Sequence, residues 1–405
     1  MQAFIARQPI FDRKLNVVAY ELLFRDGLDN VFDFSNGTEA TSRVIVNSFL
    51  NFDFESLTRG KRAFINVDRN ILVRDYLHLF SPEHIVPEIL ETVRPDKEVL
   101  TACQELKQQG FELSLDDVIE YDDVAELAQY LDIVKVDFSQ TDAEQQSRLA
   151  HRCHAESIKV LAEKVETKTE FLRAERLGYH FFQGFFFSQP TLLARKDIAG
   201  NKLHYLELLR LINGPSIDFE GLSKVIQRDL SLSYRLLRYV NARSLTWQRE
   251  IRSLHQALVA LGIDSVKNWA SLVTVSILAD DTPDELLRLS ISRARFCELL
   301  AGRLSRPDMS SDVFLVGMLS LLDVILDVPM AELLETVPLS PNIRGALLGT
   351  EGFERQLLDL VIAYEKAAWS DVASISGDLG MEMGDLPDLF IEALDWSNES
   401  FASES

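Results

Sequence analysis

The sequence predicts a protein of two parts, a TIM-like (β/α) barrel in the first half and an all-helical domain in the second. Two observations favour this fold class. Residues 1–190 alternate short β-type runs with amphipathic helical runs, a pattern typical of parallel βαβ units. From His204 onward the chain shows helical periodicity and no convincing strand pattern. We therefore expect an α/β barrel followed by a helical bundle.

The strand-like runs of the first half contain polar residues or end in them. Because these residues recur at many strands instead of clustering at one crossover, an eight-strand barrel is favoured over an open sheet. The runs are 17–25 with Glu21, 63–67 with Asn66, 84–90 with Glu88, 113–115 followed by Asp116 and Asp117, 133–138 with Lys135, 159–165 with Glu163, and 180–187 with Gln183.

Amphipathic helices are expected between these strands. In one of them Val99, Ala102, Cys103 and Leu106 recur at helical spacing, and Gly110 follows as a C-terminal stop. The expected helices cover residues 38–52, 69–77, 96–109, 122–130, 141–151 and 168–177.

The composition changes after Pro190, where residues 191–201 are mixed and polar with Gly200 as a breaker. We expect a barrel domain at 1–195, a linker at 196–203, a helical domain at 204–396 and an acidic tail at 397–405. Within the second domain we expect helices at 204–211, 219–228, 232–242, 253–261, 265–279, 284–305, 312–326 and further pieces to about residue 396.

Composition excludes several classes of protein. With 405 residues, 47% hydrophobic and 26% charged, the chain has the make-up of a soluble globular protein. Three cysteines without a C-x-x-C motif favour a reduced, cytoplasmic setting. We find neither a signal-like N-terminus nor an apolar run near the roughly 20 residues of a membrane span, so no membrane contact is expected. A net charge of −22 argues against a nucleic acid polymer as partner, although a small anion remains possible where cations line a pocket.

Asp116 and Asp117 form the most informative pair in the first half. Two adjacent carboxylates at a strand end repel each other unless a cation or hydrogen-bond donors compensate them. Together with the other polar residues they predict an oxygen-rich site for a divalent metal at one mouth of the barrel. Each residue also has a structural interpretation, since the aspartates could cap a helix and Lys135 could extend its ammonium group to water.

These residues, in this order, resemble the EAL domain, a bacterial phosphodiesterase that opens cyclic di-GMP with two Mg²⁺ or Mn²⁺ ions. Glu21 and Arg25 match its E-x-L-x-R signature, residues 162–167 resemble its A-E-G-V-E-T segment, and residues 183–187 resemble its Q-G-Y-L-F segment. The resemblance implies metal ligands, catalytic residues, substrate contacts and a loop anchor. The implied metal ligands are Glu21, Asn66, Glu88, Asp116 and Asp117. The implied catalytic residues are Lys135 and Glu163, and the implied substrate contacts are Arg25 and Gln183. Glu91 is implied to anchor the loop.

The first half departs from the EAL pattern at three places. Residues 118–121 replace the F-G-T-G loop that follows the aspartate pair in the family, Leu90 replaces a threonine, and Lys164 replaces a glycine beside Glu163. Because side chains alternate along a strand, we expect Lys164 to point away from the barrel mouth.

The second half resembles the HDOD domain, a helical relative of HD-type phosphohydrolases without their metal ligands. The matching stretch runs from 222 to 262. Leu322 precedes Asp323 where an HD hydrolase has a histidine, so no HD-type metal site is expected. His255 is interpreted as a packed or capping residue.

Both resemblances imply one function and leave one alternative. The implied function is Mg²⁺- or Mn²⁺-dependent hydrolysis of cyclic di-GMP to linear pGpG, which would favour motility over biofilm formation. The alternative is a catalytically inactive protein that binds cyclic di-GMP or acts as a scaffold. In both cases the HDOD domain would contact protein partners, and a homodimer is possible.

Overall fold

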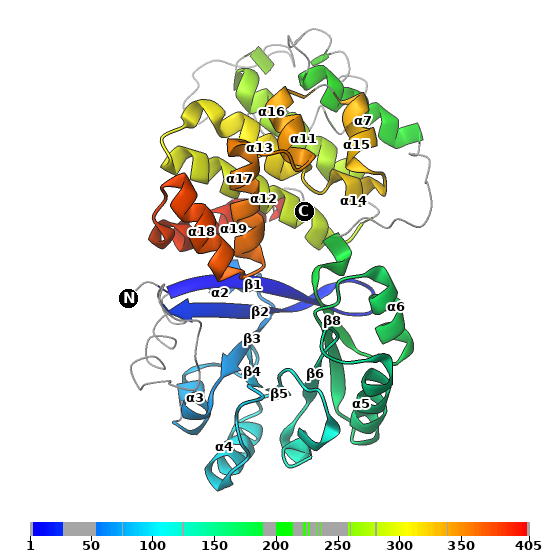
Figure 1. Ribbon diagram of the computed structural model, residues 1–405, viewed down its shortest axis with the longest axis vertical. Helices are drawn as coiled ribbons and strands as arrows, with labels where there is room; N and C mark the ends of the chain where they lie inside the picture. The colour runs from blue at the N-terminus through cyan, green and yellow to red at the C-terminus, as the bar shows by residue number, and fades with distance from the viewer. Residues whose placement is uncertain are drawn as a thin grey trace. The chain divides into compact units, whose positions relative to one another are not determined.

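The computed structural model describes residues 3–26, 54–74, 76–123, 125–188, 200–213, 261–279, 282–337 and 339–402, with a few further positions between 222 and 259 (Figure 1). Its first half is a closed barrel in which the strands follow one another in chain order from β1 to β8. The described residues after 188 contain helices and no strand. The predicted fold class, an α/β barrel followed by an all-helical region, is therefore confirmed.

Seven of the barrel strands correspond to the predicted runs, and one does not. The additional strand, β1, pairs antiparallel with β2 and with β8, whereas neighbours from β2 to β8 are parallel. The sequence pattern predicted parallel βαβ units, and it did not predict β1. The strands are β1 Ala3–Phe11, β2 Val17–Asp26, β3 Arg62–Val67, β4 Ile85–Ile89, β5 Ser114–Leu115, β6 Ile133–Asp137, β7 Lys159–Glu163 and β8 Phe181–Gln183.

The antiparallel start has a local cause in the tight connection after β1. The Asp12 carboxylate accepts hydrogen bonds from the backbone N–H groups of Lys14 and Asn16, at 2.8 and 2.9 Å. This turn brings the chain straight back on itself. A parallel pair would need a crossover of a dozen or more residues, which this connection lacks.

Helices and short turns connect the parallel strands. Asp142 and Thr167 each form a capping box, which fixes the starts of α5 and α6. The elements are α2 Phe54–Thr58, α3 Arg69–Val73, η2 Tyr76–Leu79, α4 Lys97–Gln108, η3 Tyr121–Asp123, η4 Ala128–Tyr130, α5 Ala143–Ala155, α6 Lys168–Arg176 and η5 Phe185–Ser188. The helix predicted at 122–130 was wrong, because two 3₁₀ turns are found there. The helix predicted at 38–52 lies outside the described residues.

The described helices of the second half range from 5 residues in α14 to 20 residues in α12. The predicted helix at 312–326 is divided into α13 and α14, and the helices predicted at 219–228, 232–242 and 253–261 lie largely outside the described residues. The elements are α7 Gly200–Ile212, α11 Ile263–Leu278, α12 Asp284–Arg303, η7 Pro307–Met309, α13 Ser310–Leu319, α14 Leu322–Leu326, α15 Met330–Thr336, α16 Pro341–Leu347, α17 Phe353–Glu365, α18 Trp369–Leu379, η8 Met383–Asp385 and α19 Leu386–Ala402.

One described stretch, Pro307–Leu326, has the length and apolarity of a membrane-spanning helix. The stretch has 20 residues, so the expectation that no apolar run comes near the length of a membrane span was wrong here. However, 61% of its most apolar window is buried within the fold, as in the core helix of a soluble protein. The stretch alone is therefore weak evidence for a membrane span.

The chain forms two compact units, and the C-terminal helices belong mainly to the first. This unit contains Met1–Gln189, Ala363–Gly377 and Glu382–Asn398, whereas the second contains Pro190–Ile362 with two short C-terminal pieces. Within the first unit the Phe4 and Trp369 rings lie 6.0 Å apart. Asn398 donates a hydrogen bond of 3.2 Å to the backbone oxygen of Ser56. The limits predicted for the domains, linker and tail remain predictions.

Candidate metal centre at the mouth of the barrel

The polar site rests on an apolar layer inside the barrel. Six buried residues from six strands form one core cluster: Ile10, Ala19, Phe64, Val86, Ile133 and Leu161. Because alternate residues of a strand point to the same face, the position two residues further along also faces the interior. From β2, β3, β4, β6 and β7 these positions carry Glu21, Asn66, Glu88, Lys135 and Glu163. The strand period therefore brings the predicted site residues together at the carboxyl ends of the strands.

Lys135 lies at the centre of this polar layer and is fully buried. Its Nζ atom is 2.7 Å from Glu163 Oε1, 3.1 Å from Asp116 Oδ1 and 3.3 Å from Glu21 Oε2, and it also contacts Glu88 Oε1. Four carboxylates from four strands or strand ends thus converge on one ammonium group. One positive charge cannot neutralise four ionised carboxylates, so the site has the charge to hold additional cations.

Burial and charge shift the pKa values of these groups in different directions. Burial, and next the charge of Asp116, raises the pKa of Glu88 well above its usual value, and burial likewise raises the pKa of Glu163. Burial opposes ionisation of Asp116, but the charge of Lys135 and the hydrogen bonds from neighbouring side chains together lower the pKa of that carboxyl. Burial also opposes charging of Lys135, and the surrounding carboxylates raise its pKa nevertheless.

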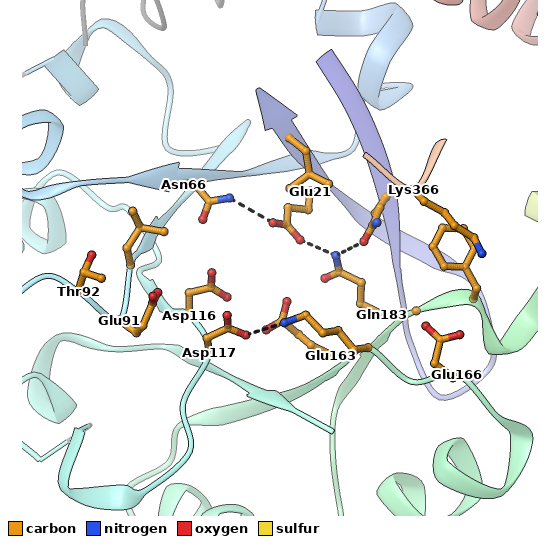
Figure 2. Close-up of a pocket in the computed structure, with 16 residues that line it drawn as sticks. Glu21, Asn66, Glu91, Thr92, Asp116, Asp117, Glu163, Glu166, Gln183 and Lys366 are labelled. Atoms are coloured by element: carbon orange, nitrogen blue, oxygen red, sulfur yellow. Dashed lines mark hydrogen bonds and ion pairs between the residues drawn. The ribbon is translucent and has the colours of Figure 1, made fainter. Parts of the chain in front are cut away.

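Two amide side chains hold Glu21 in place, as Figure 2 shows. Asn66 Nδ2 donates to Glu21 Oε1 at 3.2 Å, and Gln183 Nε2 donates to Glu21 Oε2. Gln183 also donates to Gln8 Oε1 at 3.0 Å. Sequence reasoning missed Gln8, which lies opposite Glu21 in the register of β1 and β2. Recognising the first strand would have revealed it.

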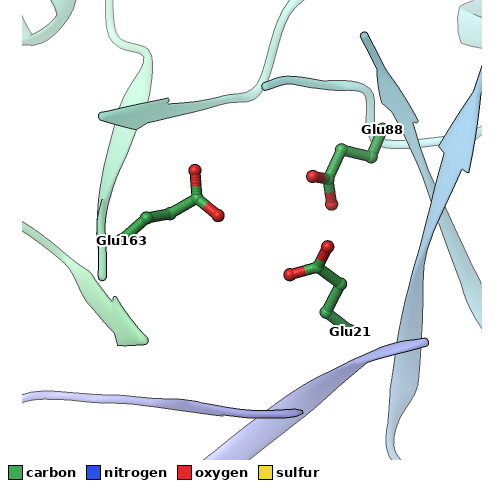
Figure 3. Close-up of side chains that lie close together, drawn as sticks. All are labelled: Glu21, Glu88 and Glu163. Atoms are coloured by element: carbon green, nitrogen blue, oxygen red, sulfur yellow. The ribbon is translucent and has the colours of Figure 1, made fainter. Parts of the chain in front are cut away.

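Two groups of carboxylates have the spacing of metal ligands. Glu21, Glu88 and Glu163 form the first, which Figure 3 shows facing one another, and Glu91, Asp116 and Asp117 form the second. Within each group the ligand oxygens lie within 4.8 Å of one another. The first group contains buried residues only, whereas the second is partly exposed.

Several buried oxygen atoms of the site are suited to binding cations. Among the described residues, Asn66 Oδ1, Glu88 Oε2 and Glu163 Oε2 are buried without a hydrogen-bond partner. With the carboxyl groups ionised, all three atoms are acceptors, and hard divalent cations take oxygen ligands of this kind. An unpaired buried acceptor is costly, so a cation bound here would remove a penalty as well as add an interaction.

Lys164 lies beside the second group, contrary to expectation. Its Nζ atom is 2.5 Å from Asp137 Oδ2 and 3.3 Å from Asp117 Oδ1. The prediction that this side chain points away from the mouth was wrong because β7 ends at Glu163, and Lys164 has a left-handed backbone with φ of +51°. Burial raises the pKa of Asp137, but hydrogen bonds, first among them the one from Lys164, lower it more. The pKa of Asp137 is therefore about 2.

A backbone hydrogen bond connects the loop after the aspartate pair to β6. Val118 is buried, and its N–H group donates to the Lys135 carbonyl oxygen at 2.9 Å. Further along the loop, the Arg152 guanidinium lies 4.6 Å from the centre of the Tyr121 ring. Glu91 lies beside Asp116 and Asp117, and burial raises its pKa. The role of Glu91 as a loop anchor remains a prediction.

A pocket of ≈ 670 Å³ lies above the carboxylates. Arg25, the predicted phosphate contact, belongs to β2 and pairs with Phe4 through its backbone, but its side chain is outside the described part of the structure. The pocket is lined by Gln8, Glu21, Leu23, Asn66, Leu90, Glu91, Thr92, Asp116, Asp117, Glu163, Lys164, Glu166, Gln183, Gly184, Phe185 and Lys366.

Asp323 stands where an HD hydrolase would have the aspartate of its metal site, but Leu322 precedes it in place of a histidine. Asp323 lies in α14, and burial raises its pKa. Both metal-capable groups found among the described residues lie in the barrel and none in the helical half. His255 lies outside the described residues.

The fold and the site define a class of protein, in which a barrel with a carboxylate-lined mouth precedes a helical domain. The family model for the EAL domain matches residues 39–190, and the model for the HDOD domain matches residues 203–337. Both matches agree with the resemblances found in the sequence.

Two relatives match nearly the whole chain. The uncharacterized protein YuxH of Bacillus subtilis is 35% identical over 404 residues, which is 98% of each chain. The cyclic di-GMP phosphodiesterase CdgJ of Vibrio cholerae is 36% identical over 399 residues, covering 98% of this chain and 92% of the relative. The solved calcium and cyclic di-GMP complex of BlrP1 from Klebsiella pneumoniae is 23% identical over 47% of this chain and 56% of that chain, with a TM-score of 0.40. The chain belongs to the family of EAL proteins that carry a following HDOD domain, within the EAL phosphodiesterase family.

Proposed function

We propose that the protein is a cyclic di-GMP phosphodiesterase that hydrolyses its substrate to linear pGpG with two Mg²⁺ or Mn²⁺ ions. The observation that supports this most is the convergence of Glu21, Glu88, Asp116 and Glu163 on one site with unpaired acceptor oxygens. The CdgJ relative carries the corresponding activity in its name.

Each site residue has a proposed role. Bound cations would supply positive charge that polarises the phosphodiester and activates water for in-line attack. Lys135 would hold a positive charge close to the negative charge that develops on the phosphate. Glu163, which is ion-paired with Lys135, is the second proposed catalytic residue. Gln183 and Arg25 would contact the substrate, and Glu91 would steady the loop after Asp117. The proposed ligands are Glu21, Asn66, Glu88, Asp116 and Asp117.

A turnover assay tests the proposed function. Purified full-length protein is incubated with cyclic di-GMP and Mn²⁺, and pGpG is followed by chromatography. We expect pGpG to form and Glu21→Ala to lower the rate by at least about a hundredfold, since it removes a metal ligand. Glu144→Ala is the matched control, because Glu144 is an exposed glutamate paired with Arg148 on α5. Absence of pGpG, or equal rates in both variants, would refute the enzymatic proposal.

One observation favours a second candidate function, a catalytically inactive signalling adaptor. Lys164 places a positive charge next to Asp117, one of the proposed metal ligands. In this version the protein binds cyclic di-GMP or no nucleotide, and it acts in the cytoplasm through protein contacts of the HDOD domain or as a homodimer. Full rescue of a deletion strain by Glu21→Ala, in motility and biofilm assays, would favour the adaptor. Failure of that variant to rescue would favour the enzyme.

A further inference from the structure

The pocket above the metal centre is strongly acidic. Six carboxylates line it, and the cationic side chains among the described lining residues are Lys164 and Lys366. A phosphodiester is an anion, so it enters such a pocket only where positive charge offsets the carboxylates. Cations bound to the carboxylates would offset part of this charge, and lysines at the rim would offset more.

The two lysines differ in what they contact. Lys164 forms ion pairs with Asp137 and Asp117, so its charge is largely engaged by the protein. Lys366 is exposed, and its Nζ atom lies 5.1 Å from the centre of the Phe185 ring. Figure 2 shows Lys366 at the edge of the pocket, on the same side as Gln183. A cation over an aromatic face keeps its charge and its hydrogen-bond donors available to a ligand.

Lys366 comes from a distant part of the sequence. It follows α17 and lies in the segment Ala363–Gly377, which belongs to the same compact unit as the barrel. The EAL family model ends at residue 190, so this side chain lies outside the matched domain. Phe185, by contrast, lies inside that domain. The pocket is thus completed by a residue that the EAL domain itself does not supply.

We propose that Lys366 is a substrate-binding residue, whose ammonium group contacts a phosphate of the cyclic dinucleotide while Phe185 positions its aliphatic stem. This inference rests on the proposed function, because it assigns a contact to the same substrate. Lys366 stands on the opposite side of the pocket from Asp117 in Figure 2. It therefore acts on binding of the nucleotide and leaves the metal ligands untouched.

Kinetics of Lys366→Gln test this inference in the full-length protein with Mn²⁺. We expect the KM for cyclic di-GMP to rise about tenfold, the effect of losing one charged contact, with kcat within about twofold. Lys366→Arg keeps the charge and should restore KM to within about threefold of the original. Lys159→Gln is the matched control, since Lys159 lies 6.0 Å from the Phe181 ring centre but does not line the pocket.

The outcomes separate this inference from the proposed function. A KM for Lys366→Gln equal to that of Lys159→Gln, in a protein that turns over cyclic di-GMP, would overturn the inference alone. A fall in kcat without a change in KM would also overturn it, since that pattern indicates a structural or catalytic effect. A protein that neither binds cyclic di-GMP in calorimetry nor hydrolyses it would overturn both proposals. Calorimetric titration with Mn²⁺ alone should give the same affinity for Lys366→Gln as for the unchanged protein.

Discussion

At the scale of single residues, Lys164 shows how one backbone angle redirects a side chain. Strand alternation would have turned it away from Glu163, but the strand ends there and Lys164 adopts φ of +51°. Glycine would take this conformation at little cost, whereas a residue with a side chain adopts it less readily. Here the lysine keeps the conformation and forms two ion pairs. The sequence revealed the substitution, but it could not reveal the angle.

The position of Lys164 predicts an effect on metal affinity. Because its ammonium group lies 3.3 Å from Asp117 Oδ1, it repels a cation at that carboxylate. Lys164→Gln should therefore raise the affinity for Mn²⁺ by about threefold to tenfold, the modest size expected for a half-exposed charge. Calorimetric titration of the protein with Mn²⁺ measures this directly. Lys159→Gln serves as the control for loss of a surface lysine, and equal affinities in the two variants would contradict the prediction.

The site residues differ in how far the sequence could predict them. Glu21, Asn66, Glu88, Lys135 and Glu163 could be found because each follows an apolar interior residue by one strand period. Gln8 was not found, because residues 3–11 were not recognised as a strand. Its contact with Gln183 depends on antiparallel pairing between distant segments, which local patterns do not encode.

At the scale of elements, the absence of the helix predicted at 122–130 has a simple physical cause. Leu127 is the one deeply buried residue among the described positions of this segment. A short helix is marginal without an apolar face to pack, so the segment forms two 3₁₀ turns instead. In α4 and α5, several buried residues recur at helical spacing, and both predicted helices are present.

The contact between α12 and α13 gives a prediction about stability. A Cβ atom at Gly317 of α13 would lie 2.6 Å from the backbone nitrogen of Ala294 of α12, so the two helices meet backbone to backbone. Gly317→Ala should lower the free energy of unfolding by about 1 to 3 kcal/mol, since the helices must separate. Urea denaturation followed by circular dichroism measures the change.

Gly302 provides the control, because it is also helical and a Cβ atom there meets nothing within 4 Å. Gly302→Ala should be neutral or stabilising by up to about 1 kcal/mol, as expected for alanine in place of glycine in a helix. If Gly317→Ala were as stable as Gly302→Ala, the close helix contact would not constrain this position.

At the scale of the whole molecule, the order of the segments along the chain differs from their grouping into compact units. The sequence places every residue after 204 in a helical region, yet Ala363–Gly377 and Glu382–Asn398 group with the barrel. Periodicity predicts that a helix has an apolar face, but it does not specify which surface that face covers. The sequence could therefore predict α18 and α19 as helical, whereas their association with the first strands required the three-dimensional structure.

The C-terminal segment should therefore stabilise the barrel through specific aromatic contacts. Phe4 on β1 is buried, its ring lies 6.0 Å from Trp369, and Trp369 in turn lies 5.4 Å from Tyr364. Phe4→Ala and Trp369→Ala should each destabilise the protein by about 2 to 4 kcal/mol, because each removes a large packed ring.

The two substitutions should also be coupled, because each ring loses its partner when the other is removed. A double-mutant cycle in urea should give an interaction energy of about 0.5 to 1.5 kcal/mol, the range for an aromatic pair in contact. Phe4→Ala combined with Gly302→Ala is the control cycle, and its effects should add to within about 0.5 kcal/mol. Additive effects of Phe4→Ala and Trp369→Ala would show that the C-terminal segment does not pack on β1 in solution. That result would also remove the structural basis for placing Lys366 in the pocket, since Lys366 lies only three residues before Trp369.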